Sequence, residues 1–213
     1  MDMETLLTVL SGLGWILVYE ECIRLGFKQK TYAMPFFALG LNVAWEAVYT
    51  FSDFFLGEHG PLVGMTLVQS IANAAWLCLD VVILLTYFRF GRRWWPESID
   101  RKWFLPWSLL VLATCFALQL VFKKEFGTPM DAEYSAFLQN LLMSVLFISM
   151  FARRGSMEGQ SLLLAVAKWI GTLAPTLLMG VIHYDALVLV VGALCSVFDL
   201  VYIGLLVSCR KKE

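Results

Sequence analysis

The sequence predicts an all-α membrane protein, a single domain over residues 1–213 that forms one bundle of seven transmembrane helices. Of its 213 residues, 60% are hydrophobic, and the mean hydropathy is +0.73, which lies outside the range of ordinary soluble domains. Apolar runs long enough to cross a hydrocarbon layer of ~30 Å, at ~1.5 Å per residue, recur along the whole chain. So many spans leave only short connections, and we expect the function to lie inside the bundle.

Seven apolar runs follow one another along the chain. They lie at about 5–25, 33–55, 64–88, 103–122, 133–151, 161–180 and 185–207. We expect the first run to remain as a helix rather than to act as a cleavable signal. The reason is that Met1 to Glu4 holds two acids and no Lys or Arg, and no small-residue cleavage site follows.

Basic residues gather on one side of the predicted bundle. Of the 16 Lys and Arg residues, only Lys123 and Lys124 fall on the other side, and Lys168 lies within the sixth run. Cytoplasmic loops carry such an excess of positive charge. We therefore predict an outer or lumenal N-terminus and a cytoplasmic C-terminus, in a bacterial cell membrane or the endoplasmic reticulum. The segment 92–107, RRWWPESIDRKWFLPW, is expected to be an interfacial loop with aromatic anchors.

Charge and cysteine usage exclude several functions. The net charge is −1 and the bases cluster at membrane edges rather than along one face, so nucleic acid is not an expected partner. The five cysteines have no paired spacing and the two histidines are far apart, so neither a disulfide framework nor a metal site is expected. No cofactor is predicted.

Polar side chains recur at helical spacing on four of the runs. In the run 33–55 the stripe has spacings of 4, 3 and 4, adjoins Trp45, and consists of Asn42, Glu46, Tyr49 and Asp53. The run 64–88 repeats these spacings at Gln69, Asn73, Trp76 and Asp80. Weaker stripes comprise Gln139, Asn140 and Ser144 in the fifth run, and Ser196, Asp199 and Tyr202 in the seventh.

The buried acids are expected to share one cavity. Unpaired polar groups cost several kcal/mol in lipid, and a charge at midplane costs about 2.5 to 3.5 kcal/mol, so the stripes must face inward. By rise per residue, Glu46, Asp80 and Asp199 lie within about 10 Å of one another in depth. We therefore predict one polar cavity near the middle of the bundle that contains all three.

Each stripe also has a structural interpretation, in which polar side chains hold helices together by hydrogen bonds. This interpretation is favoured for Gln69, Asn73, Gln139 and Asn140. It stays open for Asp80, which lies closer to the cytoplasmic edge, and Asp53 is expected at the interface. A carboxyl group is a poorer contact between helices, which favours a functional role for Glu46 and Asp199.

Other charged residues have plain interpretations. Glu20 and Arg24, four residues apart on the first run, are expected to form a surface ion pair. Lys168 is expected to extend its ammonium group to the cytoplasmic interface.

The buried acids suit proton donation. A carboxyl group among apolar and aromatic side chains keeps its proton and can donate it, and two carboxyl groups that share a site hold one proton between them. Glu46 and Asp199 could be such a pair. Aromatic faces stabilise a passing cation, and a dry cavity protects it from water. The aromatic candidates are Trp45, Tyr49, Trp76, Phe198 and Tyr202. Asn42 and Asn73 are further candidates to contact the substrate.

Four segments resemble one known family. KQKTYAM (28–34), NVAWEAVYTF (42–51), RRGSMEGQSL (153–162) and VFDLVYIGLL (197–206) are similar to segments of the small seven-helix terpene cyclases of meroterpenoid and indole-terpenoid biosynthesis, the group that acts in paxilline and pyripyropene pathways. The family's two acidic positions fall on Glu46 and Asp199. Transfer of a third acidic position to Asp80 is less secure.

The resemblance implies cyclisation of a prenyl chain attached to an aromatic or indole head group, started by protonation of a terminal epoxide or alkene. It implies a lipophilic prenylated substrate, contact with membrane lipid, and no metal. In agreement, the chain has neither the DDxxD run of ionising cyclases nor the DxDD motif of soluble protonating ones. Glu46 is the expected proton donor with Asp199 as its partner, and the reverse assignment stays open.

Two other classes of function remain. A proton-coupled small-molecule transporter also uses intramembrane acids, but it is expected to show internal repeats, and none is found. A purely structural membrane subunit is the third possibility. A retinal receptor is disfavoured because the last run has no Lys for a Schiff base.

Overall fold

The computed structural model describes residues 2–52, 67–127 and 129–210, and within this part of the chain it is all helical. The principal helices are α1 (Met3–Gln29), α2 (Phe36–Phe51), α3 (Leu67–Phe90), α4 (Phe104–Glu125), α5 (Met130–Arg154), α6 (Leu162–Pro175) and α7 (Ala186–Arg210). A π-helix, η4 (Thr176–Ile182), continues α6, and two 3-10 helices, η2 (Gly91–Trp94) and η3 (Arg101–Trp103), lie between α3 and α4. The predicted bounds therefore agree with the observed helices to within a few residues, and the interfacial segment 92–107 contains short helical turns.

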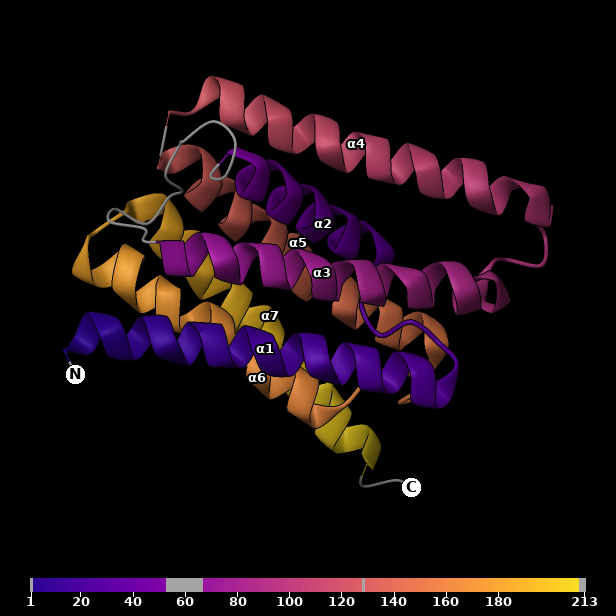
Figure 1. The fold of residues 1–213 in the computed structure, drawn as a ribbon. Helices are drawn as coiled ribbons and strands as arrows, with labels where there is room; N and C mark the ends of the chain where they lie inside the picture. The colour runs from indigo at the N-terminus through magenta and orange to yellow at the C-terminus, as the bar shows by residue number, and fades with distance from the viewer. Residues whose placement is uncertain (1, 53–66, 128, 211–213) are drawn as a thin grey trace.

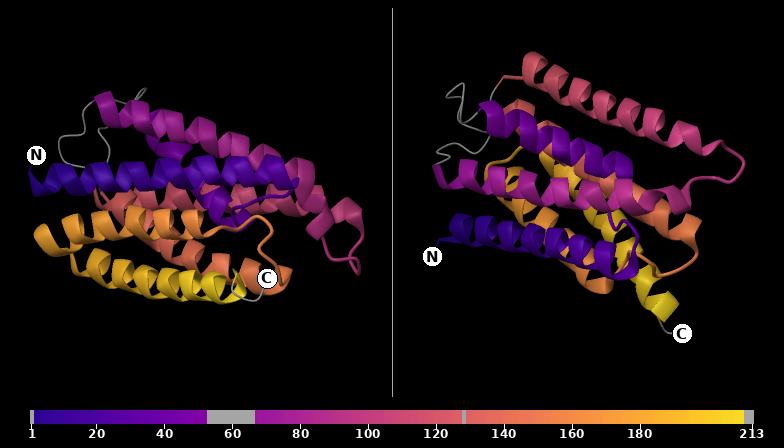
Figure 2. Two further views of the ribbon diagram at one scale, coloured as in Figure 1. Left: turned by 90° about the horizontal axis from the view of Figure 1, so that it is seen from below. Right: turned by 45° about the vertical axis from the view of Figure 1, so that its right-hand side comes forward.

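The helices form one bundle with α4 at its edge (Figure 1). α1 packs most extensively against α6, α2 lies between α3 and α4, and α5 packs against α7. The N-terminus and the end of α7 lie at opposite ends of the bundle in all views (Figures 1 and 2). Large apolar side chains such as Leu109, Leu110 and Leu120 on α4 face outward, as expected of a surface in contact with lipid.

Six of the helices are long and apolar enough to span a membrane. The exception within the described chain is α2, which has 16 residues, although its predicted run reached residue 55. A straight helix of 16 residues extends about 24 Å, which is shorter than a typical hydrocarbon layer. The predicted seventh span and the predicted orientation of the termini therefore stay predictions. The prediction for Asp53 lies outside the described residues.

Small residues bring α1 and α6 close together. Gly14 faces Gly171, and a Cβ atom at Gly14 would lie 2.8 Å from the Gly171 Cα, so only glycine fits. The Ser11 hydroxyl donates to the Gly171 carbonyl oxygen at 2.9 Å. Close approach through small residues is a usual way for membrane helices to pack. It places the face of α1 that carries Ser11 and Trp15 directly against the middle of α6.

A polar network closes the end of the bundle that carries most of the basic residues. Arg154 donates to the carbonyl oxygens of Tyr32 and Glu158, each at 2.9 Å, and its guanidinium lies over the rings of Tyr32 and Trp94. Gly159 has φ +71° and approaches the Tyr32 carbonyl too closely for a side chain. The RRGSMEGQSL segment therefore locks the α5–α6 connection onto the α1–α2 connection.

Arg24 pairs with a different acid from the one predicted. Its guanidinium contacts both oxygens of Glu21, at 2.6 and 2.7 Å, and the Ser161 hydroxyl donates to the same carboxyl group at 2.7 Å. The predicted Glu20–Arg24 pair is therefore wrong. Glu20 is exposed, whereas Glu21 is buried against the start of α6 and holds Arg24 there.

Candidate active site

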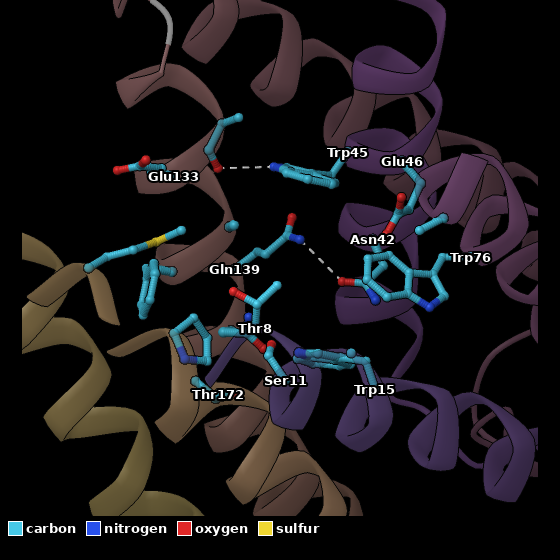
Figure 3. Close-up of a pocket in the computed structure, with 18 of the residues that line it drawn as sticks. Thr8, Ser11, Trp15, Asn42, Trp45, Glu46, Trp76, Glu133, Gln139 and Thr172 are labelled. Carbon is cyan, nitrogen blue, oxygen red and sulfur yellow. Dashed lines mark hydrogen bonds between the residues drawn. The ribbon is translucent and has the colours of Figure 1, made fainter. Parts of the chain in front are cut away.

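A cavity of about 340 Å³ lies in the half of the bundle that contains the N-terminus (Figure 3). Its wall is made by α1, α2, α3, α5, α6 and η4. Pro175 contributes to this wall at the point where α6 changes to a π-helix. The α-helix is interrupted there because proline has no backbone N–H to continue it. The polar members of the lining are Thr8, Ser11, Tyr19, Asn42, Glu46, Glu133, Gln139, Asn140 and Thr172.

Glu46 lies on one side of this cavity among indole rings. Its side chain is 5% exposed, and Oε2 has no hydrogen-bond partner within the described chain. Figure 3 shows Glu46 near Trp76, with Trp45 and Trp15 on neighbouring parts of the wall. The Trp45 indole N–H donates to the Ala132 carbonyl oxygen at 3.1 Å, which fixes that ring between α2 and α5. An acid therefore faces a cavity with aromatic walls.

A chain of hydrogen bonds between side chains leads toward the acid. Gln119 Nε2 donates to Gln139 Oε1 at 2.8 Å, and Gln139 Nε2 donates to Asn42 Oδ1 at 3.2 Å. Asn42 Nδ2 then donates to the Tyr19 hydroxyl at 3.2 Å. The chain thus links α4, α5, α2 and α1. Its last two members, Asn42 and Tyr19, line the same cavity as Glu46, which lies one helical turn beyond Asn42 on α2.

Asp80 is the acid that lies near Glu46. It is 0% exposed, and neither of its carboxyl oxygens has a hydrogen-bond partner among the described residues. Its carboxyl group interacts electrostatically with those of Glu46 and with the Tyr19 hydroxyl, although it does not line the cavity. Two buried carboxyl groups that repel one another cannot both ionise without a large cost.

Asp199 lies elsewhere, in a buried ion pair. The Lys168 ammonium group contacts both Asp199 oxygens at 2.9 Å and donates to the Ser144 hydroxyl at 2.7 Å. Lys168 is 0% exposed and Asp199 is 1% exposed, and neither lines the cavity.

Two predictions are therefore wrong. Lys168 does not extend to the interface, because α6 turns it toward α5 and α7, where Ser144 and Asp199 satisfy its charge. Glu46, Asp80 and Asp199 do not share one cavity, and Glu46 has Asp80 rather than Asp199 as its neighbour. Both predictions failed for the same reason. Sequence position gives the depth of a residue along the membrane normal, but it does not give the direction in which a helix presents that side chain.

The seven residues predicted to contact the substrate divide into two groups. Asn42, Trp45 and Trp76 line the cavity, which is the position that contact with a substrate requires. Their role in binding stays a prediction. The other four, which lie outside the cavity lining, are Tyr49, Asn73, Phe198 and Tyr202.

Two of these outer aromatic residues have clear contacts. Tyr49 packs against the Trp45 ring at 4.8 Å between centroids, behind the wall. The Tyr202 hydroxyl donates to Gln160 Oε1 at 2.7 Å and its ring stacks on Phe147, so it belongs to the closed basic end.

The sequence interpretation missed the contribution of α1. Thr8, Ser11, Trp15 and Tyr19 all line the cavity. Their spacings of 3, 4 and 4 place them on one helical face, as in the stripes of α2 and α3. Hydroxyl and indole groups make a weak polar signal within an apolar run, so the face was not recognised. Thr172 on α6 and Glu133 on α5 were missed as well.

The fold and the cavity together define a multi-pass membrane protein with an acid held at an aromatic-lined site. The family model of Pyr4-like transmembrane terpene cyclases matches residues 1–212, and the chain belongs to this family. The predicted family is thereby confirmed, and the seven principal helices of the described chain lie within the matched region.

Several curated relatives are named as terpene cyclases. The chain is 25% identical to terpene cyclase pyr4 of Aspergillus fumigatus over 95% of this chain and 85% of that protein. It is 26% identical to terpene cyclase andB of Emericella variicolor, over 95% and 87%. The match to the Pyr4-family terpene cyclase mfmH of Annulohypoxylon moriforme, also at 26%, covers 78% of this chain and 65% of that protein. No solved structure matches the chain significantly.

Proposed function

We propose that this chain cyclises the prenyl chain of a prenylated aromatic or indole substrate, and that Glu46 starts the reaction by protonating the terminal alkene or epoxide. The observation that carries the proposal is the buried Glu46 carboxyl group, which has no ion pair with any described residue, in a cavity lined by Trp15, Trp45 and Trp76. The matched family and the names of its relatives favour an enzyme of this class over a proton-coupled transporter.

The reaction balances without an external reagent. The Glu46 O–H bond breaks and its proton bonds to the terminal alkene carbon or to the epoxide oxygen. The electron pairs of successive alkenes then close the rings and leave a cation on carbon. A C–H bond next to that cation gives its electrons to a new alkene, and the proton returns to the Glu46 carboxylate. The product is an isomer of the substrate, and the acid is regenerated.

The walls of the cavity support each step. Indole faces stabilise a nearby cation by about 2 kcal/mol or more when water is excluded. The apolar lining, which includes Phe137, Leu178 and Met179, limits the access of water that would trap the cation. Asp80, behind Glu46, adds a second carboxyl group to the acid centre without contact with the substrate.

Asp199 does not fit the donor role. Its two oxygens hold the Lys168 ammonium group, and an aspartate in such an ion pair accepts protons rather than donating them. We therefore propose Glu46 as the donor. We place Asp199 among the residues that hold α6 and α7 in position beside the cavity.

Glu46→Gln is the direct test, because the amide keeps the size of the side chain and removes the acidic proton. Membranes that contain the chain are supplied with linear prenylated phenols and indoles, with and without a terminal epoxide, and the products are followed by mass and retention time. We expect an isomer of the substrate from the wild-type chain. We expect the rate of Glu46→Gln to be lower by about 10²-fold to 10⁴-fold.

Asp131→Asn is the matched control. Asp131 is a carboxyl group on α5 that is 1% exposed but does not line the cavity. We expect this variant to retain cyclisation. Full activity of Glu46→Gln would remove Glu46 from the chemistry. In a single turnover of enzyme first equilibrated with D₂O, an alkene substrate that forms product without deuterium would contradict initiation by protonation.

A further inference from the structure

The hydrogen bonds that lead to Tyr19 all run in one direction. Each amide in the series donates through its nitrogen, from Gln119 to Gln139, from Gln139 to Asn42, and from Asn42 to Tyr19, and Gln139 and Asn42 also accept through their oxygens. The last acceptor is the Tyr19 hydroxyl oxygen. Tyr19 is 2% exposed.

This direction determines what Tyr19 can do. A tyrosine hydroxyl has one proton, and because its oxygen already accepts from Asn42, that proton is available for another acceptor. Tyr19, Asn42 and Glu46 line the same cavity, and Glu46 follows Asn42 by one helical turn on α2. The Glu46 carboxyl group therefore lies on the face of α2 that carries Asn42, the residue that binds the Tyr19 hydroxyl. An electrostatic interaction between Tyr19 and Glu46 agrees with this placement.

We infer that Tyr19 is a positioning residue for the acid, and that the amide chain holds its hydroxyl proton toward Glu46. This inference rests on the proposed function. A Tyr19 oxygen that accepted from Glu46 would draw the acidic proton away from the cavity. With Tyr19 as donor, the proton of Glu46 stays available to the substrate in the cavity.

Tyr19 also acts during proton transfer. As Glu46 loses its proton, negative charge develops on a carboxyl group that is 5% exposed. A donor already aimed at that charge stabilises the transition state without further reorganisation, as the donors of an oxyanion hole do. Loss of the hydroxyl should therefore lower kcat and leave KM nearly unchanged, because the ring that lines the cavity remains.

Tyr19→Phe tests the inference against Tyr87→Phe. Tyr87 is also a buried tyrosine with one hydrogen bond between side chains, to Ser108 at 3.1 Å, but it lies outside the cavity. We expect Tyr19→Phe to lower kcat by about 10²-fold to 10³-fold, and Tyr87→Phe to keep the wild-type kcat. Thermal unfolding in detergent is measured for both, to separate rate from stability.

Several results would overturn the inference. One is a kcat for Tyr19→Phe within about threefold of the wild type, and another is a loss confined to KM. A loss of rate that Tyr87→Phe reproduces, in step with a lower unfolding temperature, would show that both hydroxyls only stabilise the fold. By contrast, a wild-type chain that cyclises no prenylated substrate would overturn the proposed function itself, and the inference with it.

Gln119→Leu tests the same inference from outside the cavity. Gln119 begins the amide chain, is 2% exposed and does not line the cavity. Without its donor, the Gln139 amide is free to turn, and the orientation of Asn42 and Tyr19 is no longer held. We expect a smaller decrease in kcat with KM and product unchanged. If Tyr19→Phe does not accumulate in folded form, a wild-type kcat in Gln119→Leu would be sufficient to overturn the inference.

Discussion

The two ends of this bundle use the same kinds of buried polar residue in opposite ways. At the basic end, Arg154, Gln160 and Glu21 each bind another part of the protein. At the end with the cavity, Glu46 Oε2 and both Asp80 oxygens have no hydrogen-bond partner in the described part of the chain. Buried polar groups without partners are costly, so we interpret the first set as structural and the second as the acid centre, in which only Glu46 faces the cavity.

The contrast is sharpest for the buried acids. Asp199 and Asp80 are equally hidden, at 1% and 0% exposure. Asp199 forms an ion pair with Lys168, which also donates a hydrogen bond to Ser144. Asp80 instead has a second carboxyl group, that of Glu46, as its electrostatic neighbour. Burial alone therefore does not identify a catalytic acid. The charge of the nearest groups does.

Asp199→Asn should have the largest effect, because it leaves the Lys168 ammonium group buried without a counter-ion. Removal of one partner from a buried ion pair costs about 3 to 5 kcal/mol. We expect a severe loss of folded protein, measured by size-exclusion chromatography and thermal unfolding in detergent, and loss of product as a consequence.

The double variant Lys168→Met/Asp199→Leu is the matched control, because it removes both charges and keeps apolar volume. We expect it to regain folded protein, since replacing a buried ion pair by apolar residues is often neutral. Cyclisation by the folded double variant would show that Asp199 stabilises the fold and takes no part in the chemistry. A folded but inactive double variant would return Asp199 to the chemistry and contradict its structural role.

Arg154→Met should have the next largest effect, on stability rather than on rate. Arg154 makes two hydrogen bonds to carbonyl oxygens that tie the α5–α6 connection to the α1–α2 connection. We expect a loss of about 2 to 3 kcal/mol in the free energy of unfolding, with kcat per folded molecule unchanged. Arg153→Met, at the exposed neighbouring position, is the control. A lower kcat with normal stability would show that the basic end takes part in catalysis.

The comparison also explains what could be predicted from the sequence. Hydropathy runs and the basic residues of the connections are local properties, so the helices, their approximate ends and the inward faces of Asn42 and Glu46 were predictable. The partner of Asp199 was not, because rise per residue gives depth but not the direction of a side chain about the bundle. Lys168 was misplaced for the same reason.

The face of α1 shows a different limit. Ser11, Trp15 and Tyr19 have the spacing that revealed Glu46, but their groups cost little in lipid, so the argument from burial cost did not select them. Their position in the cavity depends on the contact between Gly14 and Gly171, which brings α1 onto α6. Such a contact between helices distant in sequence is a property of the packed bundle.

Asp80→Asn should have a smaller effect than Asp199→Asn and Arg154→Met. It tests whether Glu46 and Asp80 act together. The amide keeps the shape of the side chain and removes the second carboxyl group from beside Glu46, without any change in the cavity wall. We expect kcat to fall by about tenfold, equivalent to about 1.4 kcal/mol in the barrier, with KM and the unfolding temperature close to the wild type. The measurement is a steady-state comparison with Glu46→Gln in the same membranes. A loss as complete as that of Glu46→Gln would make Asp80 an essential proton carrier, whereas unchanged kinetics would leave Glu46 and Tyr19 as the whole acid centre.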